Sequence, residues 1–202
     1  GEYVVLRFGW LYGPGTWYGK DGMIYNQFID GNVTLSDGVT SFVHLDEDNQ
    51  EYYVTSHSFV ATKGGLDGKI DRDFIDYRQL AESGYCTITD LQSGIINTDQ
   101  VLNYIEDYID KYKLDVQALC YDPYSIHGVI AEIERRDWPY DLVEIRQGPQ
   151  TLSNPILDFR LKVINGDIKH HKNPLLDIAI KNAVAKDTND SLMIEKKMNR
   201  EK

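Results

Sequence analysis

Hydrophobic residues recur along this chain with two different spacings, one typical of strands and one typical of helices. Residues 2–8 are β-branched and aromatic, which predicts a strand. The most regular helix is predicted from Asn97, a favourable N-cap with Gln100 as its capping partner, to Tyr112. Its apolar stripe is formed by Val101, Leu102, Ile105, Tyr108, Ile109 and Tyr112.

The same patterns place the other elements. Further strands are expected at residues 42–45, 51–60, 85–89, 116–121, 142–145 and 168–170. Helices are expected at 23–29, from Phe74 up to Gly84, at 126–133, from Asn154-Pro155 to Gly166 and from Asn173-Pro174 to Ala183. Residues 62–72 are predicted to be a polar loop, and 186–202 a polar tail that frays. This alternation predicts an α/β layered domain with a mixed sheet.

Composition narrows the class of protein. With 202 residues and 42% apolar content, the chain can bury one substantial core. It contains no apolar run of about 20 residues and no secretory leader, so we expect neither membrane insertion nor secretion. Two cysteines without metal-ligand spacing, Cys86 and Cys120, indicate reduced thiols in a cytoplasmic setting.

The charge is unevenly distributed. A net charge of −11 opposes nucleic-acid binding, because phosphate contacts depend on Lys and Arg. Residues 160–202, however, contain ten Lys/Arg against six Asp/Glu. That excess fits either a face that meets a polyanion or a solvated helical surface.

Asp122 is the leading candidate for chemistry. It follows the apolar strand 116–121 and precedes Pro123, so it should lie at the C-terminal edge of a sheet. Ligands and metals collect at that edge in open α/β sheets. The alternative, equally weighted on the local residues alone, is an N-cap for the helix that begins near Ser125.

Two segments at the start resemble the later part of extended short-chain dehydrogenases and sugar-nucleotide epimerases. They are Val5-Leu6-Arg7-Phe8-Gly9-Trp10-Leu11-Tyr12-Gly13-Pro14-Gly15 and Asp37-Gly38-Val39-Thr40-Ser41-Phe42-Val43-His44-Leu45-Asp46. The glycine-rich nucleotide fingerprint and the catalytic Tyr-x-x-x-Lys pair of that family would both precede Gly1 and are not in this chain.

Residues from about 41 to 202 resemble the nuclease domain of tailed-phage terminase large subunits. The resemblance is carried by Ala118-Leu119-Cys120-Tyr121-Asp122-Pro123-Tyr124, Val143-Glu144-Ile145-Arg146-Gln147-Gly148, Thr151-Leu152-Ser153, Asn165-Gly166-Asp167-Ile168-Lys169-His170, Asn173-Pro174 and Asn182-Ala183-Val184. It implies a ribonuclease H-like mixed sheet flanked by helices, here with an irregular N-terminal segment. It also implies an endonuclease that uses two Mg²⁺ or Mn²⁺ ions on double-stranded DNA. The implied partners are the terminase small subunit and the portal, in the cytoplasm of a bacterial host.

By this resemblance, Asp122 is a catalytic metal ligand, but most of its expected companions are missing. The family's opening-strand aspartate falls in a region that here reads Val33-Thr34-Leu35-Ser36-Asp37, with threonine in its place. Asp37 is therefore a second candidate metal ligand, with a turn aspartate before glycine as the alternative. A further acid would follow Lys202, so we expect a C-terminally truncated and impaired nuclease.

The two resemblances overlap at residues 41–46, which suggests that an epimerase fragment is joined there to a terminase nuclease fragment. We expect residues 1–40 to be an epimerase-like segment rather than an independent domain, and 41–202 to be the C-terminally truncated nuclease-like domain. Two other functions stay open: a fragment of an NAD-dependent epimerase or dehydratase that binds a nucleotide sugar, and a non-catalytic structural remnant.

Several basic residues are weaker candidates. Lys196, Lys197 and Arg200 are predicted to contact DNA, with a solvated tail as the alternative. Arg135 and Arg136 could touch phosphates or end a helix. His170 and His171 are more often structural than metal ligands in such a context. His127 could hydrogen-bond a phosphate or the Asp122 carboxylate, although surface exposure is the ordinary expectation.

Overall fold

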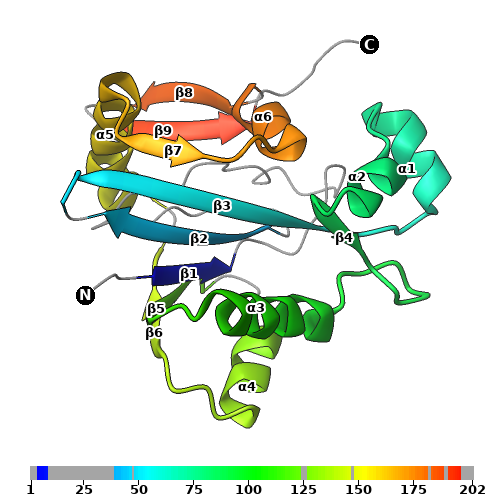
Figure 1. Cartoon of the computed structure of the whole chain (residues 1–202). Helices are drawn as coiled ribbons and strands as arrows, with labels where there is room; N and C mark the ends of the chain where they lie inside the picture. Colours follow the sequence, from blue (N-terminus) through cyan, green and yellow to red (C-terminus); the bar gives the residue numbers. More distant parts are fainter. Residues whose placement is uncertain are drawn as a thin grey trace.

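Figure 1 shows the computed structural model, which describes residues 4–8, 39–46, 48–123, 127–146, 148–181, 183–188 and 191–196. Its centre is a mixed sheet of seven strands. The predicted helix at 23–29 and the turn after Phe8 lie outside the described residues. Both cysteines are buried free thiols.

The sheet is built outward from a central strand. β1 (Val4–Phe8) lies between β2 (Val39–Asp46), which is antiparallel to it, and β5 (Val116–Tyr121), which is parallel. β3 (Glu51–Val60) extends the antiparallel side, and β6 (Asp141–Glu144) the parallel side. The outer edge of β3 pairs with β4 (Cys86–Ile88) at one end and β7 (Ile168–His170) at the other, both in parallel.

Strand direction decides which loops meet. The order is β4-β3-β2-β1-β5-β6, and only β2 runs against the other strands of this sheet. The C-terminal ends of β1, β3, β5, β6 and β7 therefore point toward one edge. The predicted mixed α/β fold is confirmed, and the predicted strand 2–8 becomes the middle of the sheet.

One face of the sheet is covered by α3 (Thr98–Tyr112) and α4 (His127–Arg135). Leu102 and Ile105 of α3 are fully enclosed against Leu119 of β5. The predicted cap is confirmed, because the Asn97 side chain accepts a hydrogen bond from the Asp99 amide. Gln100 does something else: its amide group bonds to the backbone of Asp90 and Ile88, which fastens the preceding loop.

The opposite face carries α5 (Pro149–Asn165), α6 (Pro174–Lys181) and a hairpin of β8 (Ala183–Thr188) and β9 (Ser191–Lys196). The start predicted for α5 at Asn154-Pro155 is wrong, since the helix already begins at Pro149. Pro155 lacks only its own helical hydrogen bond, and the burial of Leu152 and Ile156 against Met193 outweighs that loss.

The predicted fraying tail is also wrong up to Lys196. β8 and β9 pair through their whole length, and the Leu192 amide donates to Ser153 Oγ at 2.8 Å. A polar sequence forms a hairpin here because Met193 and Leu192 have an apolar surface on α5 to cover.

At the β4 edge lie α1 (Leu66–Asp73) and α2 (Tyr77–Glu82). α1 falls in the stretch predicted to be a polar loop. It is held by an ion pair of 3.0 Å between Lys69 and Asp73, both almost fully buried, and by a hydrogen bond from the Tyr77 hydroxyl to Asp73. Phe74, expected to start the next apolar stripe, instead ends α1 with a left-handed backbone and a side chain that is 93% exposed.

Candidate functional site

Asp122 lies at the sheet edge where the parallel strands end. It directly follows β5, which has β1 on one side and β6 on the other. The Ile145 amide donates to the Tyr121 carbonyl at 2.7 Å, so the strands stay fastened up to the residue before Asp122. The side chain is 8% exposed. A carboxylate thus stands at the edge predicted from the sequence.

The register row just inside Asp122 contains two serines, one of them fully buried. Ser56, Ser41, Arg7 and Cys120 are register partners across β3, β2, β1 and β5. Ser41 is fully buried, and among the described residues its hydroxyl has no hydrogen-bond partner. Because side chains alternate along a strand, Asp122 belongs to the same face as Cys120 and Ser41. This is the face covered by α5 and α6.

The neighbouring strand ends do not bring a second acid to this face. β1 contains no Asp or Glu, so the opening strand of the sheet carries no carboxylate. The missing aspartate was expected in residues 33–37, but β1 is formed by Val4–Phe8. Residues 33–37 lie outside the described residues. Glu144 ends β6, but it is in register with Tyr121 and therefore on the other face, where it bonds to Arg146 at 2.7 Å.

A divalent-metal site needs several oxygen ligands around one point. Within the described part of the chain, no group of three or more His, Cys, Asp or Glu could hold an ion. Asp37 lies outside the described residues. On the described residues alone, the acids do not complete a metal centre, and Asp122 is the one carboxylate in a suitable place.

The predicted DNA-contacting tail is only partly described. Lys196 ends β9 in the hairpin that packs on α5, whereas Lys197 and Arg200 lie outside the described residues. His127 is the first residue of α4 and follows a stretch, 124–126, that is outside them too. The alternative role of Asp122 as a cap for this helix is therefore untested.

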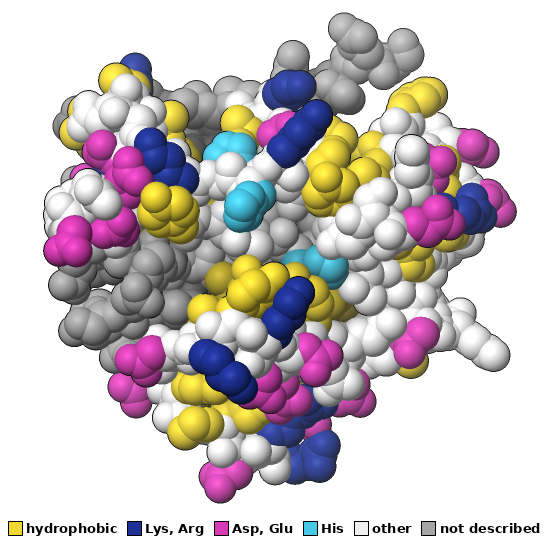
Figure 2. Space-filling model, in the orientation of Figure 1, with side chains coloured by type: hydrophobic (Ala, Val, Ile, Leu, Met, Phe, Trp, Pro, Cys, Tyr) yellow, Lys and Arg dark blue, Asp and Glu magenta, His cyan; other side chains and the backbone are white. Residues whose placement is uncertain are grey.

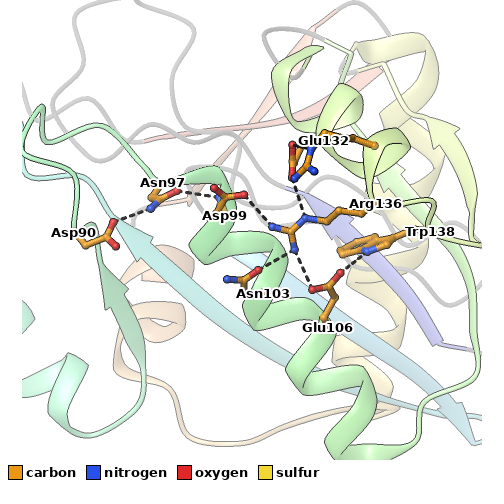
Figure 3. A network of polar contacts seen from close by, with 9 residues as sticks. Asp90, Asn97, Asp99, Asn103, Glu106, Glu132, Arg136 and Trp138 are labelled. Carbon is orange, nitrogen blue, oxygen red and sulfur yellow. Dashed lines mark hydrogen bonds and ion pairs between the residues drawn. The ribbon is translucent and has the colours of Figure 1, made fainter.

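The guanidinium of Arg136 forms ion pairs with three acidic side chains of the protein, so it is not available for a phosphate (Figure 3). Arg136 directly follows α4 and donates to Glu132 of that helix and to Asp99, Asn103 and Glu106 of α3, at 2.8 to 3.1 Å. Trp138 also donates to Glu106. These bonds tie α4 to α3. Arg135 pairs with Glu132 and is 72% exposed, so of the two predicted phosphate candidates only Arg135 faces solvent.

His170 and His171 are both exposed at the end of β7. His170 Nδ1 bonds to the His171 carbonyl at 3.0 Å, and the described residues place no cluster of metal ligands around either ring. Both residues precede Asn173, whose side chain accepts bonds from the amides of Leu175 and Leu176. The predicted cap of the last helix is thereby confirmed.

His57 is a buried titratable residue that the sequence analysis did not single out. Its ring is 5% exposed, stacks on Tyr104 and bonds to Thr87 Oγ1. Burial lowers the pKa of His57 from 6.5 to about 4, against the opposing effect of a backbone hydrogen bond with Gly84. The strand periodicity that buries Phe59 also buries the residue two positions earlier, and that was the available signal.

Comparison with known proteins agrees with this architecture. The crystal structure of the HK97 bacteriophage large terminase matches 96% of this chain with a TM-score of 0.68 and 17% sequence identity. The likeness shows the same fold. It covers 35% of the phage protein, so the chain spans about a third of that terminase.

A second relative matches a much shorter stretch. A 3-diazoavenalumate denitrifying reductase from Streptomyces sp is 47% identical over 47 residues, which is 22% of this chain and 16% of the reductase. That length is close to the extent of the dehydrogenase-like segment, residues 1–46. No helix among the described residues is long and apolar enough to cross a bilayer.

The sequence model of one family, "Terminase large subunit, endonuclease domain", matches residues 12–202, nearly the whole chain and all described strands except β1. Because this family model covers nearly the whole chain, the chain belongs to the endonuclease-domain family of terminase large subunits.

Proposed function

We propose that this chain is a DNA endonuclease domain that depends on Mg²⁺ or Mn²⁺ and is impaired by the loss of acidic ligands. The observation that carries the proposal is the place of Asp122, at the C-terminal end of β5 between two parallel neighbours. When bound there, a divalent ion would polarise a phosphodiester and supply a nucleophilic water. Asp122 is the residue that would hold it.

The expected impairment follows from the number of acids. One carboxylate cannot hold two ions about 4 Å apart, so acids on other strands are needed. β1, adjacent to β5, contributes none, and Glu144 lies on the opposite face. We therefore expect slow, metal-stimulated nicking rather than efficient cleavage.

Plasmid nicking tests this function. Supercoiled DNA is incubated with the wild type in Mg²⁺, in Mn²⁺ and in EDTA, next to Asp122→Asn and a control, Asp107→Asn, which removes an exposed carboxylate on α3. We expect slow nicking by the wild type and the control in metal only, and none by Asp122→Asn. Nicking that survives in Asp122→Asn, or no nicking by any protein, would contradict the proposal.

The packaging context is part of the same proposal. A domain of this family would act on double-stranded DNA in the cytoplasm of a bacterial host, beside a small terminase subunit and a portal. Co-purification of the chain with these two proteins after co-expression would test it. Failure of both to bind would restrict the proposal to the nuclease.

We further propose that residues 1–40 come from an epimerase-like protein and are joined to the nuclease near residues 41–46. The match to the reductase over 47 residues supports this origin. Val4–Phe8 then fills the place of the opening strand because an apolar, β-branched sequence pairs well there, although it brings no catalytic acid. A genomic read across residues 37–46 that shows one uninterrupted terminase gene would refute the join.

The resemblance of residues 5–15 and 37–46 to sugar-nucleotide epimerases leaves a second candidate function, the binding of a nucleotide sugar by the N-terminal segment. The chain offers no glycine-rich fingerprint for a dinucleotide, so only substrate-side contacts would remain. A metal-independent rise in the melting temperature with UDP-glucose would favour this function. An unchanged melting temperature would argue against it.

A further inference from the structure

Lys169, His170, His171 and Lys172 form a basic segment that follows β7 and leads into α6. All four residues are exposed, and the side chain of Lys169 is 44% exposed. Lys169 is engaged by Glu51 at 3.2 Å and by the Gly166 carbonyl. Among the described residues, no carboxylate pairs with Lys172 or with either imidazole.

The basic segment runs toward the sheet edge where Asp122 lies. β7 ends at His170, level with Val54 of β3, and the chain continues to Asn173, which contacts Ser56. β7 is parallel to β3, and β3 runs in the same direction as β1 and β5, because β2 is antiparallel to both of its neighbours. The loops after β7 and after β5 must therefore emerge on one side of the molecule. Figure 1 places the end of β7 and the start of α6 above β3.

The two are also on the same face. Asn173, directly after the basic segment, donates its side-chain amide to the Ser56 carbonyl at 3.0 Å and to Ser56 Oγ at 3.2 Å. Ser56 is in register with Ser41, and Ser41, through β1, with Cys120, which lies two residues before Asp122. The anchor of the basic segment and the approach to Asp122 thus share one row of the sheet.

The separation along this row suits a nucleic-acid duplex. From β7 to β5 there are four strand spacings of about 4.8 Å, roughly 19 Å in all, and the anchor of Asn173 on β3 is one spacing closer. These separations lie between one and two widths of the B-DNA major groove, about 12 Å, so one duplex can present phosphates to both places. Figure 2 shows histidine side chains exposed in the middle of this view, with Lys and Arg side chains beside them.

From this placement we propose that the basic segment Lys169–Lys172 binds the phosphate backbone of the DNA whose scissile phosphate is presented to Asp122. The inference rests on the proposed nuclease function and adds the surface that orients its substrate. Lys172 supplies a compact positive charge, and the exposed His171 imidazole can donate an N–H to a phosphate oxygen, whereas His170 Nδ1 already donates to the His171 carbonyl. The acids nearest in the chain are Asp167, before β7, and Asp177, in the first turn of α6.

Equilibrium binding tests the inference separately from cleavage. The affinity of a fluorescent random-sequence duplex is measured by anisotropy in EDTA, over a series of salt concentrations, for the wild type, Lys172→Gln, Lys172→Arg and Lys111→Gln. Lys111 is an exposed lysine on α3, which covers the opposite face of the sheet. Lys111→Gln therefore makes the same change in net charge as Lys172→Gln, but away from the basic segment.

We expect Lys172→Gln to weaken binding about threefold and to lower the salt slope by about one, whereas Lys172→Arg and Lys111→Gln stay close to the wild type. Equal weakening by Lys172→Gln and Lys111→Gln, or no duplex binding by the wild type, would overturn the inference. Metal-dependent nicking that requires Asp122 would still support the nuclease function in either case. An unchanged melting temperature of Lys172→Gln checks its fold.

Discussion

The imidazole of His57 lies flat against the phenol ring of Tyr104, with the ring centroids 3.9 Å apart and the planes inclined by 17°. Phe59 meets the same imidazole edge-on at 5.2 Å. The ring stays neutral in the folded protein, because burial lowers the pKa of His57 to about 4. A titratable group is therefore part of the packing between β3 and α3.

This arrangement predicts a loss of stability in mild acid. The folded pKa is below the ordinary 6.5, so between those two values the unfolded chain binds more protons than the folded one. The contribution of His57 to the free energy of unfolding is fully present above pH 6.5 and is lost as the pH falls toward 4. The full loss is on the order of 3 kcal/mol. Urea unfolding at a series of pH values measures it.

The control for this prediction is His57→Gln, which keeps a polar group near Thr87 but does not titrate. Its free energy of unfolding should fall less with acidification than that of the wild type. If both proteins lose stability in parallel between pH 6.5 and 4, His57 is not the group responsible.

Removal of Arg136 should separate α4 from α3. Its guanidinium is 15% exposed and bonds to three carboxylates, Asp99, Glu106 and Glu132. We expect Arg136→Ala to lower the free energy of unfolding by about 2 to 4 kcal/mol, because three acids then face one another without the cation. Arg135→Ala is the matched control. That residue pairs with Glu132 from an exposed position, so its loss should cost less than about 1 kcal/mol.

Two glycines should respond in opposite ways to alanine. At Gly94 the backbone φ is +71°, and an added Cβ would lie 2.5 Å from the Lys63 amide nitrogen. Gly94→Ala should therefore destabilise the fold by more than about 2 kcal/mol. Gly68 lies inside α1 with no atom within 4 Å of an added Cβ, and Gly68→Ala should stabilise by up to about 1 kcal/mol. Thermal unfolding of both variants measures the difference, and shifts of the same sign would contradict it.

The buried Lys69–Asp73 pair should be more sensitive to loss of one member than of both. Both side chains are nearly enclosed, at 4% and 8% exposure, and the Tyr77 hydroxyl donates to the same carboxylate. Asp73→Asn leaves the buried ammonium without its carboxylate and should cost about 3 kcal/mol. The double variant Lys69→Met/Asp73→Leu should recover part of that loss. A double variant less stable than Asp73→Asn would argue against this explanation.

The sequence alone determined the elements whose residues interact locally. Asn97 and Asn173 cap the helices they were expected to cap, because a cap bond joins residues two or three positions apart. The apolar stripe of α3 and the strand ending at Asp122 were likewise readable, since burial repeats with the period of the element. The same local rules misplaced the start of α5 and missed the β8–β9 hairpin, whose stability comes from distant contacts such as Met193 on Leu152. They also missed α1, where Leu66 and Ile70 pack against the cluster of Val60, Tyr77 and Cys86.

Tertiary structure decided which residues stand beside Asp122. Only the pairing of β1 between β2 and β5 shows that the opening strand is Val4–Phe8 and that it brings no acid to the edge. Only the strand directions show that the basic segment Lys169–Lys172 runs toward the edge where Asp122 lies, although the two lie far apart along the chain. A sequence pattern gives a side chain its face and its period, whereas the neighbours of a site are set by strand register, and register depends on the packing of the whole sheet.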